Sequence, residues 1–284
     1  MSDVQFSAAA LDLRELALHA RIASLGSLLV AYSGGTDSAF LAWVAHEVLR
    51  EDMLALLAGS PSLPRRELKL AIEFAERWSI PLAVIHTDEM SRPEYTRNDS
   101  SRCFHCKNEL FTVMERERTL RNFRHIAYGK NLDDQSNFRP GDRAAKQHHV
   151  VAPLADVGLT KPEIRSLARR YELEVWDKPA SACLSSRIEY GRPVTREALA
   201  VIEAGEEALR GFGFRQARVR HHGETARIEI GRDELDRSFS SKMAPQFVSI
   251  FKNLGFKYVT LDCEGYRSGS MNAVLPIESI KIAE

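Results

Sequence analysis

Short apolar runs alternate with amphipathic segments through the first half of the chain, and this alternation limits the possible folds more than any other feature. The apolar runs read SLLVAY, MLALLA, PLAVIHT, HIAYG and HVVAPL, and segments with helical periodicity lie between most of them. A further helix is predicted over residues 8–25, and another after the capping box of Thr160 and Glu163. Buried strands that alternate with helices are typical of a parallel sheet covered on both faces. We therefore expect an α/β fold with a doubly wound parallel sheet.

The second half of the chain has a different pattern. Between Trp176 and Thr195, Pro, Gly, Ser and Cys gather without periodicity, which is typical of a functional loop. A helical segment follows, then two strand-like runs joined at Gly223 and Glu224, further helices and the strand-like run FKYVTLD. The sequence thus predicts an α/β domain over residues 1–176, a functional cysteine loop over 177–194, and a smaller α+β domain over 195–284.

Charge and composition narrow the class of protein. The 284 residues carry 39 Lys and Arg against 39 Asp and Glu, so the formal net charge is zero. Proteins that bind nucleic acid usually carry a basic excess, so we expect no nucleic-acid partner. The sequence has no long uncharged apolar run and no N-terminal signal pattern, so we expect no membrane partner and a cytoplasmic location.

The first apolar run ends in the small-residue segment AYSGGTDSAF. Such a strand-to-helix turn exposes backbone N–H groups at a helix N-terminus, where phosphate groups bind readily. The alternative is a plain tight turn capped by Thr36 or Asp37. The segment lacks the G-K-[ST] ending of a Walker A loop and the G-x-G-x-x-G pattern of dinucleotide sites. The candidate phosphate-binding residues are Ser33, Gly34, Gly35, Thr36, Asp37 and Ser38.

Three further polar loops are predicted at the same edge of the sheet. In a doubly wound sheet, ligands bind beyond the carboxyl ends of the strands. The segments AGSPSLPRREL and YGKNLDDQSNFRPGDRAA each follow a predicted strand, as does Asp88. An Asx-rich turn and an exposed arginine are the structural alternatives. The candidate nucleotide or metal contacts are Ser60, Asp88, Gly129, Asn131, Asp133, Asp134 and Arg139.

The four cysteines suggest metal chemistry. Cys103 and Cys106 lie one helical turn apart in RCFHCKNELF, and Cys183 lies in KPASACLSSRIEYG. Three thiolates suit a zinc site completed by a His or by Cys263, or an iron–sulfur cluster with one iron left open. Cys263, in the other predicted domain, is equally explained by packing.

Taken in order, these segments resemble a known family. SGGTDS matches the loop of the PP-loop ATP pyrophosphatases, and the series from SGGTDS to GYRSGSMNA resembles LarE, the sulfur transferase family of nickel-pincer nucleotide synthesis. The likeness runs over nearly the whole chain, from about residue 24 to residue 273. It implies that a carboxylate of pyridinium-3,5-biscarboxylic acid mononucleotide attacks the α-phosphate of ATP, that pyrophosphate leaves, and that Asp37 helps to hold Mg²⁺.

The resemblance also assigns the sulfur chemistry. It implies that the sulfur is delivered to the substrate at Cys183, by one of two routes. In one branch of the family the cysteine gives up its own sulfur and becomes dehydroalanine. In a three-cysteine branch, a [4Fe–4S] cluster on the equivalents of Cys103, Cys106 and Cys183 carries a hydrosulfide, which inorganic sulfide or a sulfur donor supplies. We expect the cluster here, with sacrificial donation or a zinc site as alternatives.

Several charged residues are candidates for the substrate. Arg187 and Lys178 flank Cys183, and either one lowers the pKa of its thiol or binds substrate phosphate. Arg218 and Arg220 alternate along a predicted strand and therefore share one face; the resemblance implies that they bind the substrate phosphate, and a solvated edge is the alternative. Glu203 and Asp233 are weaker candidates. The family resemblance also suggests a homo-oligomer, possibly a hexamer.

Other functions have specific weaknesses. Another PP-loop enzyme is the first alternative, such as a tRNA thiolase, an NAD synthase or another ammonia-using synthetase. The zero net charge speaks against tRNA, and nothing in the sequence marks a glutaminase. A scaffold without catalysis is the second alternative, and the intact SGGTDS segment together with Cys183 speaks against it. The favoured interpretation is an AMP-forming, ATP-dependent sulfur transferase.

Overall fold

The computed structural model describes residues 8–136, 140–179, 182–267 and 270–271. The chain divides into two compact units. We call them the first unit (residues 1–88 and 103–181) and the second unit (residues 89–102 and 182–284). The short stretch 89–102 therefore groups with the C-terminal part of the chain, which the sequence boundaries did not include. Among the described residues, no helix is long and apolar enough to cross a membrane.

The first unit contains a parallel sheet in the strand order β3-β2-β1-β4. The apolar runs of the sequence form its strands, and β1 is buried along its whole length, as a central parallel strand must be. The strands are β1 (Leu28–Tyr32), β2 (Met53–Ala58), β3 (Leu82–Ile85) and β4 (His125–Tyr128). Since β1 has β2 on one side and β4 on the other, the strand order reverses at the carboxyl end of β1.

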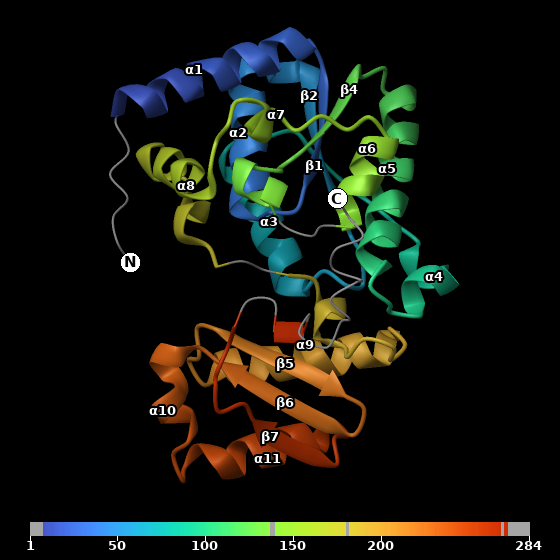
Figure 1. Ribbon diagram of the computed structural model, residues 1–284, viewed down its shortest axis with the longest axis vertical. Helices are drawn as coiled ribbons and strands as arrows, with labels where there is room; N and C mark the ends of the chain where they lie inside the picture. Colours follow the sequence, from blue (N-terminus) through green and yellow to red (C-terminus); the bar gives the residue numbers. More distant parts are fainter. Residues whose placement is uncertain (1–7, 137–139, 180–181, 268–269, 272–284) are drawn as a thin grey trace. The chain divides into compact units, whose positions relative to one another are not determined.

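Helices cover both faces of this sheet, as expected for a doubly wound fold (Figure 1). Leu28, Val30 and Tyr32 pack with residues of α1, α2, α3 and α8, whereas Leu29 and Ala31 pack with residues of α5 and α6. The alternation follows from the two-residue period of a strand. The helices of this unit are α1 (Ala8–Leu25), α2 (Thr36–Leu49), α3 (Arg65–Arg77), α5 (Arg102–Leu120), α6 (Pro140–Gln147), α7 (Pro153–Asp156) and α8 (Lys161–Arg170).

Two local predictions in the first unit have different outcomes. The capping box is present at the start of α8, where Glu163 accepts from the backbone N–H and the hydroxyl of Thr160. The strand expected in HVVAPL is wrong: Val151 makes only an isolated parallel bridge to Ala127, and α7 begins at Pro153. Proline has no N–H for a strand ladder, and its fixed φ suits the first turn of a helix.

The second unit is built on a three-stranded sheet in the order β5-β6-β7. β5 (Ala217–His222) and β6 (Thr225–Ile230) form the expected antiparallel hairpin, and β7 (Tyr258–Leu261) pairs parallel with β6. The unit also contains α4 (Pro93–Thr96), α9 (Arg196–Gly211), α10 (Leu235–Ser238) and α11 (Met243–Asn253). Thr195 caps α9 by accepting from the N–H of Ala198 at 3.1 Å.

The two faces of this second sheet differ in character. Val219 and Ile228 are register partners and are completely buried on one face. Arg218 pairs with Glu229, and Arg220 pairs with Arg227, on the opposite face. The prediction that Arg218 and Arg220 share a face therefore agrees with the register.

Candidate functional site

The carboxyl end of β1 leads directly into the glycine-rich segment, at the point where the strand order reverses. In open parallel sheets this is where ligands bind. Gly34 has φ +69°, and a Cβ atom there would lie 2.5 Å from the Cβ of Ala71 in α3. Both the left-handed backbone and the close approach of α3 exclude a side chain. Glycine at this position therefore lets the loop turn sharply in close contact with α3.

Hydroxyl groups brace the same loop. Ser38 Oγ accepts from the N–H of Ser33 at 3.1 Å, lies 3.0 Å from Ser33 Oγ, and donates to the carbonyl of Gly35 at 3.1 Å. Thr36 Oγ1 donates to the buried carbonyl of Val175 at 2.8 Å. The first N–H groups of α2 have no partner within the helix and lie at its positive end. The arrangement suits an anion such as a phosphate group.

Asp37, in the first turn of α2, forms an ion pair with a lysine. Lys161 Nζ, at the start of α8, lies 2.7 Å from Asp37 Oδ2. The other carboxylate oxygen, Oδ1, is buried and has no hydrogen-bond partner within the described part of the chain. A buried carboxylate oxygen without a donor is energetically costly, and a bound cation removes that cost. Asp37 is therefore a fitting ligand for a divalent ion.

The loop after β4 packs closely on the start of α2. A Cβ at Gly129 would lie 2.8 Å from the backbone nitrogen of Ser38, so glycine lets this loop touch the helix backbone. Asn131 and Asp134 are buried, and each side chain accepts from the backbone N–H of the other residue. Asp134 Oδ2 lies 3.3 Å from the backbone nitrogen of Asn131, and Asn131 Oδ1 lies 3.2 Å from that of Asp134. Asp133 Oδ2 accepts from the backbone N–H of Lys161 at 2.8 Å. The acidic residues thus shape the loop and place Lys161.

The loop after β2 contributes a serine turn. Ser60 Oγ accepts from the N–H of Ser62 at 3.0 Å, and the carbonyl of Ser60 accepts from Leu63 at 3.0 Å. The backbone N–H of Asp88, after β3, donates to Glu109 at 3.3 Å. Arg139 lies outside the described residues.

Lys178 lies on the glycine-rich loop. Its ammonium donates to the carbonyl of Gly34 at 2.9 Å and pairs with Glu67 of α3 at 2.8 Å. From the sequence, we expected Lys178 either to lower the pKa of the Cys183 thiol or to bind a substrate phosphate. In the structure its ammonium contacts the glycine-rich loop and α3. Arg165 donates to the carbonyl of Lys178 at 2.8 Å, which fixes this segment further.

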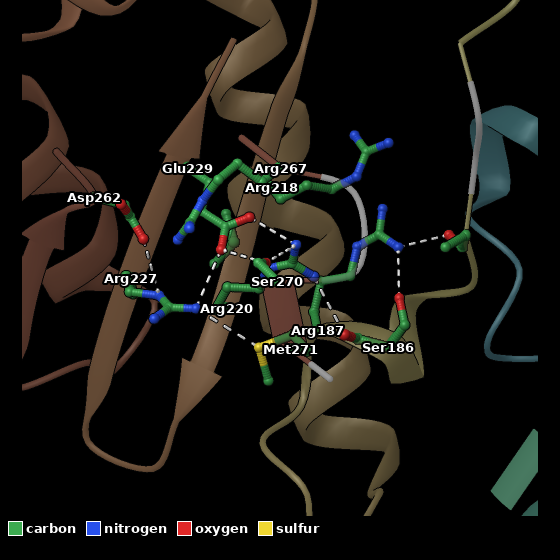
Figure 2. Close-up of polar contacts among 12 residues, drawn as sticks. Ser186, Arg187, Arg218, Arg220, Arg227, Glu229, Asp262, Arg267, Ser270 and Met271 are labelled. Carbon is green, nitrogen blue, oxygen red and sulfur yellow. Dashed lines mark hydrogen bonds and ion pairs between the residues drawn. The ribbon is translucent and has the colours of Figure 1, made fainter. Parts of the chain in front are cut away.

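The second unit presents a group of arginines on the polar face of its sheet (Figure 2). Glu229 is completely buried and accepts from Arg220 at 2.6 Å and from Arg227 at 3.1 Å. Ser270 donates to Glu229 at 3.1 Å. Arg220 Nε is buried and has no hydrogen-bond partner in the part of the chain that the structure describes. A buried cationic N–H of this kind is ready to bind an anion.

Arg218 lies on the same face and is nearly as buried as Arg220. Its guanidinium donates to the carbonyl of Ala217 at 2.8 Å and lies 5.2 Å from the ring centre of Tyr266. Burial, and next the charge of Arg187, lower the pKa of Arg218. These groups gather more positive charge than the neighbouring carboxylates neutralise, so the face favours an anionic ligand.

Arg187 holds the turn that contains Cys183. Cys183 is the N-cap of the 3₁₀ turn Leu184–Arg187, and Arg187 Nη1 donates to the carbonyls of Ala182 at 2.6 Å and Cys183 at 2.9 Å. The other side of the guanidinium pairs with Glu206 of α9 at 2.8 Å. Arg187 is almost completely buried, and its contacts are those of a residue that fixes the backbone around the cysteine.

The remaining candidates are spread over both units. Glu203 is half-buried on α9, one turn before Glu206. Asp233 is exposed and pairs with Arg215 at 2.7 Å. Cys103 and Cys106 lie in the first helical turns of α5, and Cys263 is exposed after β7. None of the four cysteines forms a disulfide bond. The described residues contain no group of three potential ligands already placed to hold a metal ion.

Sequence reasoning missed three residues that organise these sites. Lys161 is 124 positions from Asp37 in the chain, and its only signal was its place at the start of a capped helix. Glu206 and Glu229 are buried acids whose partners, Arg187 and Arg220, were identified without them. The strand alternation that placed Arg220 on one face could have placed Glu229 there as well.

One protein-family model and three known proteins are similar to this chain over long stretches. A family model described as NAD synthase matches residues 15–126. An uncharacterized protein of Synechocystis sp. is 40% identical over 88% of this chain and 94% of its own length. The pyridinium-3,5-bisthiocarboxylic acid mononucleotide synthase of Lactiplantibacillus plantarum is 30% identical over 94% of this chain and 96% of its own length. An uncharacterized protein of Methanocaldococcus jannaschii is 32% identical over 85% of this chain and 91% of its own length.

Proposed function

The chain belongs to the LarE family of ATP-dependent sulfur transferases, and from this premise we propose that it converts pyridinium-3,5-biscarboxylic acid mononucleotide into its thiocarboxylate. The observation that carries the proposal is the anion site formed by Ser33–Ser38 at the end of β1, in a chain of this family. Two rounds of the reaction, one at each carboxylate, give the bisthiocarboxylate that the name of the Lactiplantibacillus relative describes.

The first step is adenylation. A carboxylate oxygen of the substrate attacks the α-phosphorus of ATP, the bond to the bridging oxygen of the β-phosphate breaks, and pyrophosphate leaves with that electron pair. The loop N–H groups and the hydroxyls of Ser33 and Ser38 hold the leaving pyrophosphate, whose negative charge the N-terminus of α2 stabilises. Gly129, Asn131, Asp134 and Ser60, from the loops after β4 and β2, are the proposed contacts to the rest of the nucleotide. The product is an acyl-adenylate.

Magnesium is the metal that this chemistry implies, and the residues fit it. The buried, unpartnered Oδ1 of Asp37 is an oxygen ligand beside the phosphate loop, and Mg²⁺ in such sites usually takes one or two carboxylates plus phosphate oxygens. When bound, the ion neutralises charge on the phosphates. Asp37 would hold the ion, and Lys161, which contacts Asp37 in the structure, would then be available to a phosphate oxygen.

The substrate's own phosphate binds the arginine face of the second unit. Arg218 and Arg220 are the proposed ligands, since both are buried and point from alternate positions of β5 to the same face. Arg220 Nε supplies an N–H that has no other partner in the described residues. Glu203 is proposed to lie near the pyridinium ring, where a carboxylate offsets its positive charge.

The second step transfers sulfur at Cys183. A sulfur nucleophile attacks the acyl carbon, the bond to the AMP oxygen breaks, and AMP leaves with the electron pair. In the sacrificial route the nucleophile is Sγ of Cys183; loss of its Cα proton then breaks the Cβ–S bond, leaving dehydroalanine and a thiocarboxylate. Arg187 fixes the backbone of the cysteine during either route.

We favour a cluster on Cys103, Cys106 and Cys183 as the sulfur carrier. The donor chemistry fits, because none of the three cysteines is in a disulfide bond and two lie one turn apart at the start of α5. In the described residues, these cysteines do not form a ready-made group of three metal ligands. When bound, such a cluster supplies an open iron for an incoming sulfide.

One experiment tests the reaction and the sulfur source together. The protein is purified without oxygen, its iron and sulfide are measured, and it is mixed with ATP and the substrate. We expect pyrophosphate and AMP in equal amounts, iron and sulfide that disappear in Cys106→Ala, and Cys183 with unchanged mass. Iron-free protein in which Cys183 becomes lighter by H₂S instead supports the sacrificial route. No pyrophosphate release with this substrate contradicts the proposed function.

A further inference from the structure

The stretch between β3 and α5 grips the turn that follows Cys183. Residues 89–102 belong to the second unit although they lie between two elements of the first unit in sequence. Their side chains reach residues 185–192 through several buried hydrogen bonds, and none of them was a candidate in the sequence. Neither the nucleotide site nor the arginine face explains why so many polar groups are buried here.

Asn98 is the centre of this network. It is completely buried and has φ +60°, a conformation in which Asn is enriched among residues other than glycine. Its side-chain amide nitrogen lies 2.9 Å from the carbonyl of Glu189 and 2.8 Å from that of Arg192, with the carbonyl of Ile188 at 3.4 Å. Its own carbonyl accepts from the N–H of Gly191 at 3.0 Å. Asn98 thus contacts four backbone groups within residues 188–192: three carbonyls and one N–H.

Arg102 and Tyr95 continue the network to Ser185. Arg102 is almost completely buried; its Nη1 donates to the carbonyl of Ser185 at 2.8 Å and to Asn98 Oδ1. Its guanidinium also lies 5.6 Å from the ring centre of Tyr190. The hydroxyl of Tyr95 lies 2.6 Å from Ser185 Oγ, and both side chains are buried. We call Tyr95, Asn98 and Arg102 the Ser185 clamp.

The clamp holds Ser185, which lies inside the turn that Cys183 caps. Ser185 and Cys183 are two residues apart in the turn that Cys183 caps. Arg187 holds the carbonyl of Cys183 from within the turn, and the clamp holds the carbonyl and hydroxyl of Ser185 from outside. Hydrogen bonds from a buried cation are strong and directional, so they fix orientation in a way that apolar packing does not. The position of the cysteine is therefore specified from two directions.

We infer that the Ser185 clamp positions Cys183 for the sulfur-transfer step and has no part in adenylation. The inference rests on the proposed function for its second half, because only a two-step reaction can separate the two effects. All three are positioning residues, since Tyr95 and Arg102 act through Ser185, and Asn98 acts through Arg102 and the segment 188–192. A displacement of about 1 Å at a reacting group can lower a rate about 100-fold, so loosening the turn slows the second step strongly.

The first test measures the cysteine turn without any substrate. In iron-free protein, the alkylation rate of Cys183 by iodoacetamide is followed by mass spectrometry of its peptide. We expect Arg102→Gln and Tyr95→Phe to raise this rate severalfold, because the turn opens when Ser185 is released. Arg97→Gln, at an exposed position of the same stretch, is the matched control and leaves the rate unchanged. Equal rates in wild type and both clamp variants overturn the inference, whether or not the proposed function holds.

The second test separates the two chemical steps in a single turnover. With ATP and pyridinium-3,5-biscarboxylic acid mononucleotide, we expect Arg102→Gln to release pyrophosphate within about twofold of the wild-type rate while thiocarboxylate forms about tenfold or more slowly. Tyr95→Phe removes one oxygen and keeps the ring, and we expect it to slow thiocarboxylate formation less strongly, again with little effect on pyrophosphate release. This second variant keeps the test decisive if Arg102→Gln does not fold. A parallel fall of both steps indicates a general structural defect and contradicts the inference. Wild-type protein that releases no pyrophosphate contradicts the proposed function instead, and the alkylation result still decides the clamp.

Discussion

Lys161 Nζ lies 2.7 Å from Asp37 Oδ2, so the lysine ammonium already pairs with the carboxylate that we propose as the magnesium ligand. The lysine comes from the first position of α8, whose N–H is held by Asp133. The pair is partly exposed, so its two side chains can separate at little cost. In the proposed function, the cation that arrives with ATP would therefore compete with Lys161 for Asp37.

The first prediction concerns this competition. In Lys161→Met no ammonium competes for Asp37, so we expect the Mg²⁺ concentration for half-maximal pyrophosphate release to fall severalfold, even though the maximal rate falls because a phosphate contact is lost. The measurement is a Mg²⁺ titration at saturating ATP. Lys69→Met, at a highly exposed lysine of α3, is the control. An unchanged or higher Mg²⁺ requirement in Lys161→Met contradicts the assignment of Asp37 and Lys161.

The second prediction concerns the loop backbone. Gly34→Ala places a Cβ 2.5 Å from Ala71 and forces a side chain into φ +69°. Gly158→Ala has a similar φ of +73° but no atom within 4 Å of the added Cβ, so it carries the backbone strain alone. We expect Gly158→Ala to cost about 1 kcal/mol of unfolding free energy, and Gly34→Ala about 1–3 kcal/mol more and the loss of ATP binding. Thermal unfolding and nucleotide titration measure both effects, and equal behaviour of the two variants argues against the close packing of Gly34.

The third prediction concerns the buried carboxylate of the arginine face. Glu229→Ala leaves Arg220 and Arg227 without their shared acceptor, and removing one partner of a buried ion pair costs about 3–5 kcal/mol. Arg220→Met roughly keeps the side-chain volume and leaves Glu229 with Arg227 and Ser270 as partners. We therefore expect it to lower the free energy of unfolding less than Glu229→Ala does, and to weaken mononucleotide binding. Chemical denaturation and isothermal titration separate the two. Unchanged substrate affinity in Arg220→Met rules out this face as the phosphate site.

The fourth prediction is a pH dependence of stability. Burial, and next the charge of Arg192, lower the pKa of His221, which packs against Phe256. The folded protein thus binds a proton less readily than the unfolded chain, whose histidine pKa is about 6.5. The contribution of His221 to stability is complete above that pH and is lost as the pH falls from about 6.5 toward the lower folded pKa. We expect the melting temperature of His221→Gln to fall less between pH 7 and pH 5 than that of wild type.

His149→Asn, at an exposed position, is the control for this experiment. It removes a histidine outside the packed interior of the second unit and should follow the wild-type curve. If His221→Gln loses as much stability on acidification as wild type does, another group is responsible for the pH dependence.

The parts of this structure that the sequence predicted are those with a local signal. Strand burial and helix periodicity predicted the parallel sheet, and the Gly-Gly pair predicted the sharp turn between β1 and α2, since both features depend on residues that are neighbours in the chain. HVVAPL carried the same apolar signal as a strand, but Pro153 ended it after a single bridge. Contacts between residues far apart in the chain, such as Lys161 with Asp37 and Arg102 with Ser185, have no local signal. The grouping of residues 89–102 with the second unit follows from the same kind of contact.

Transfer of a labelled oxygen tests the central claim most directly. The substrate is prepared with ¹⁸O in both carboxylates, mixed with ATP and protein, and the AMP and pyrophosphate are analysed by mass spectrometry. Because the carboxylate attacks the α-phosphorus and its oxygen stays on AMP when sulfur replaces it, we predict one ¹⁸O in each AMP and none in pyrophosphate. AMP without label, or label in pyrophosphate, contradicts the acyl-adenylate and with it the account of this site.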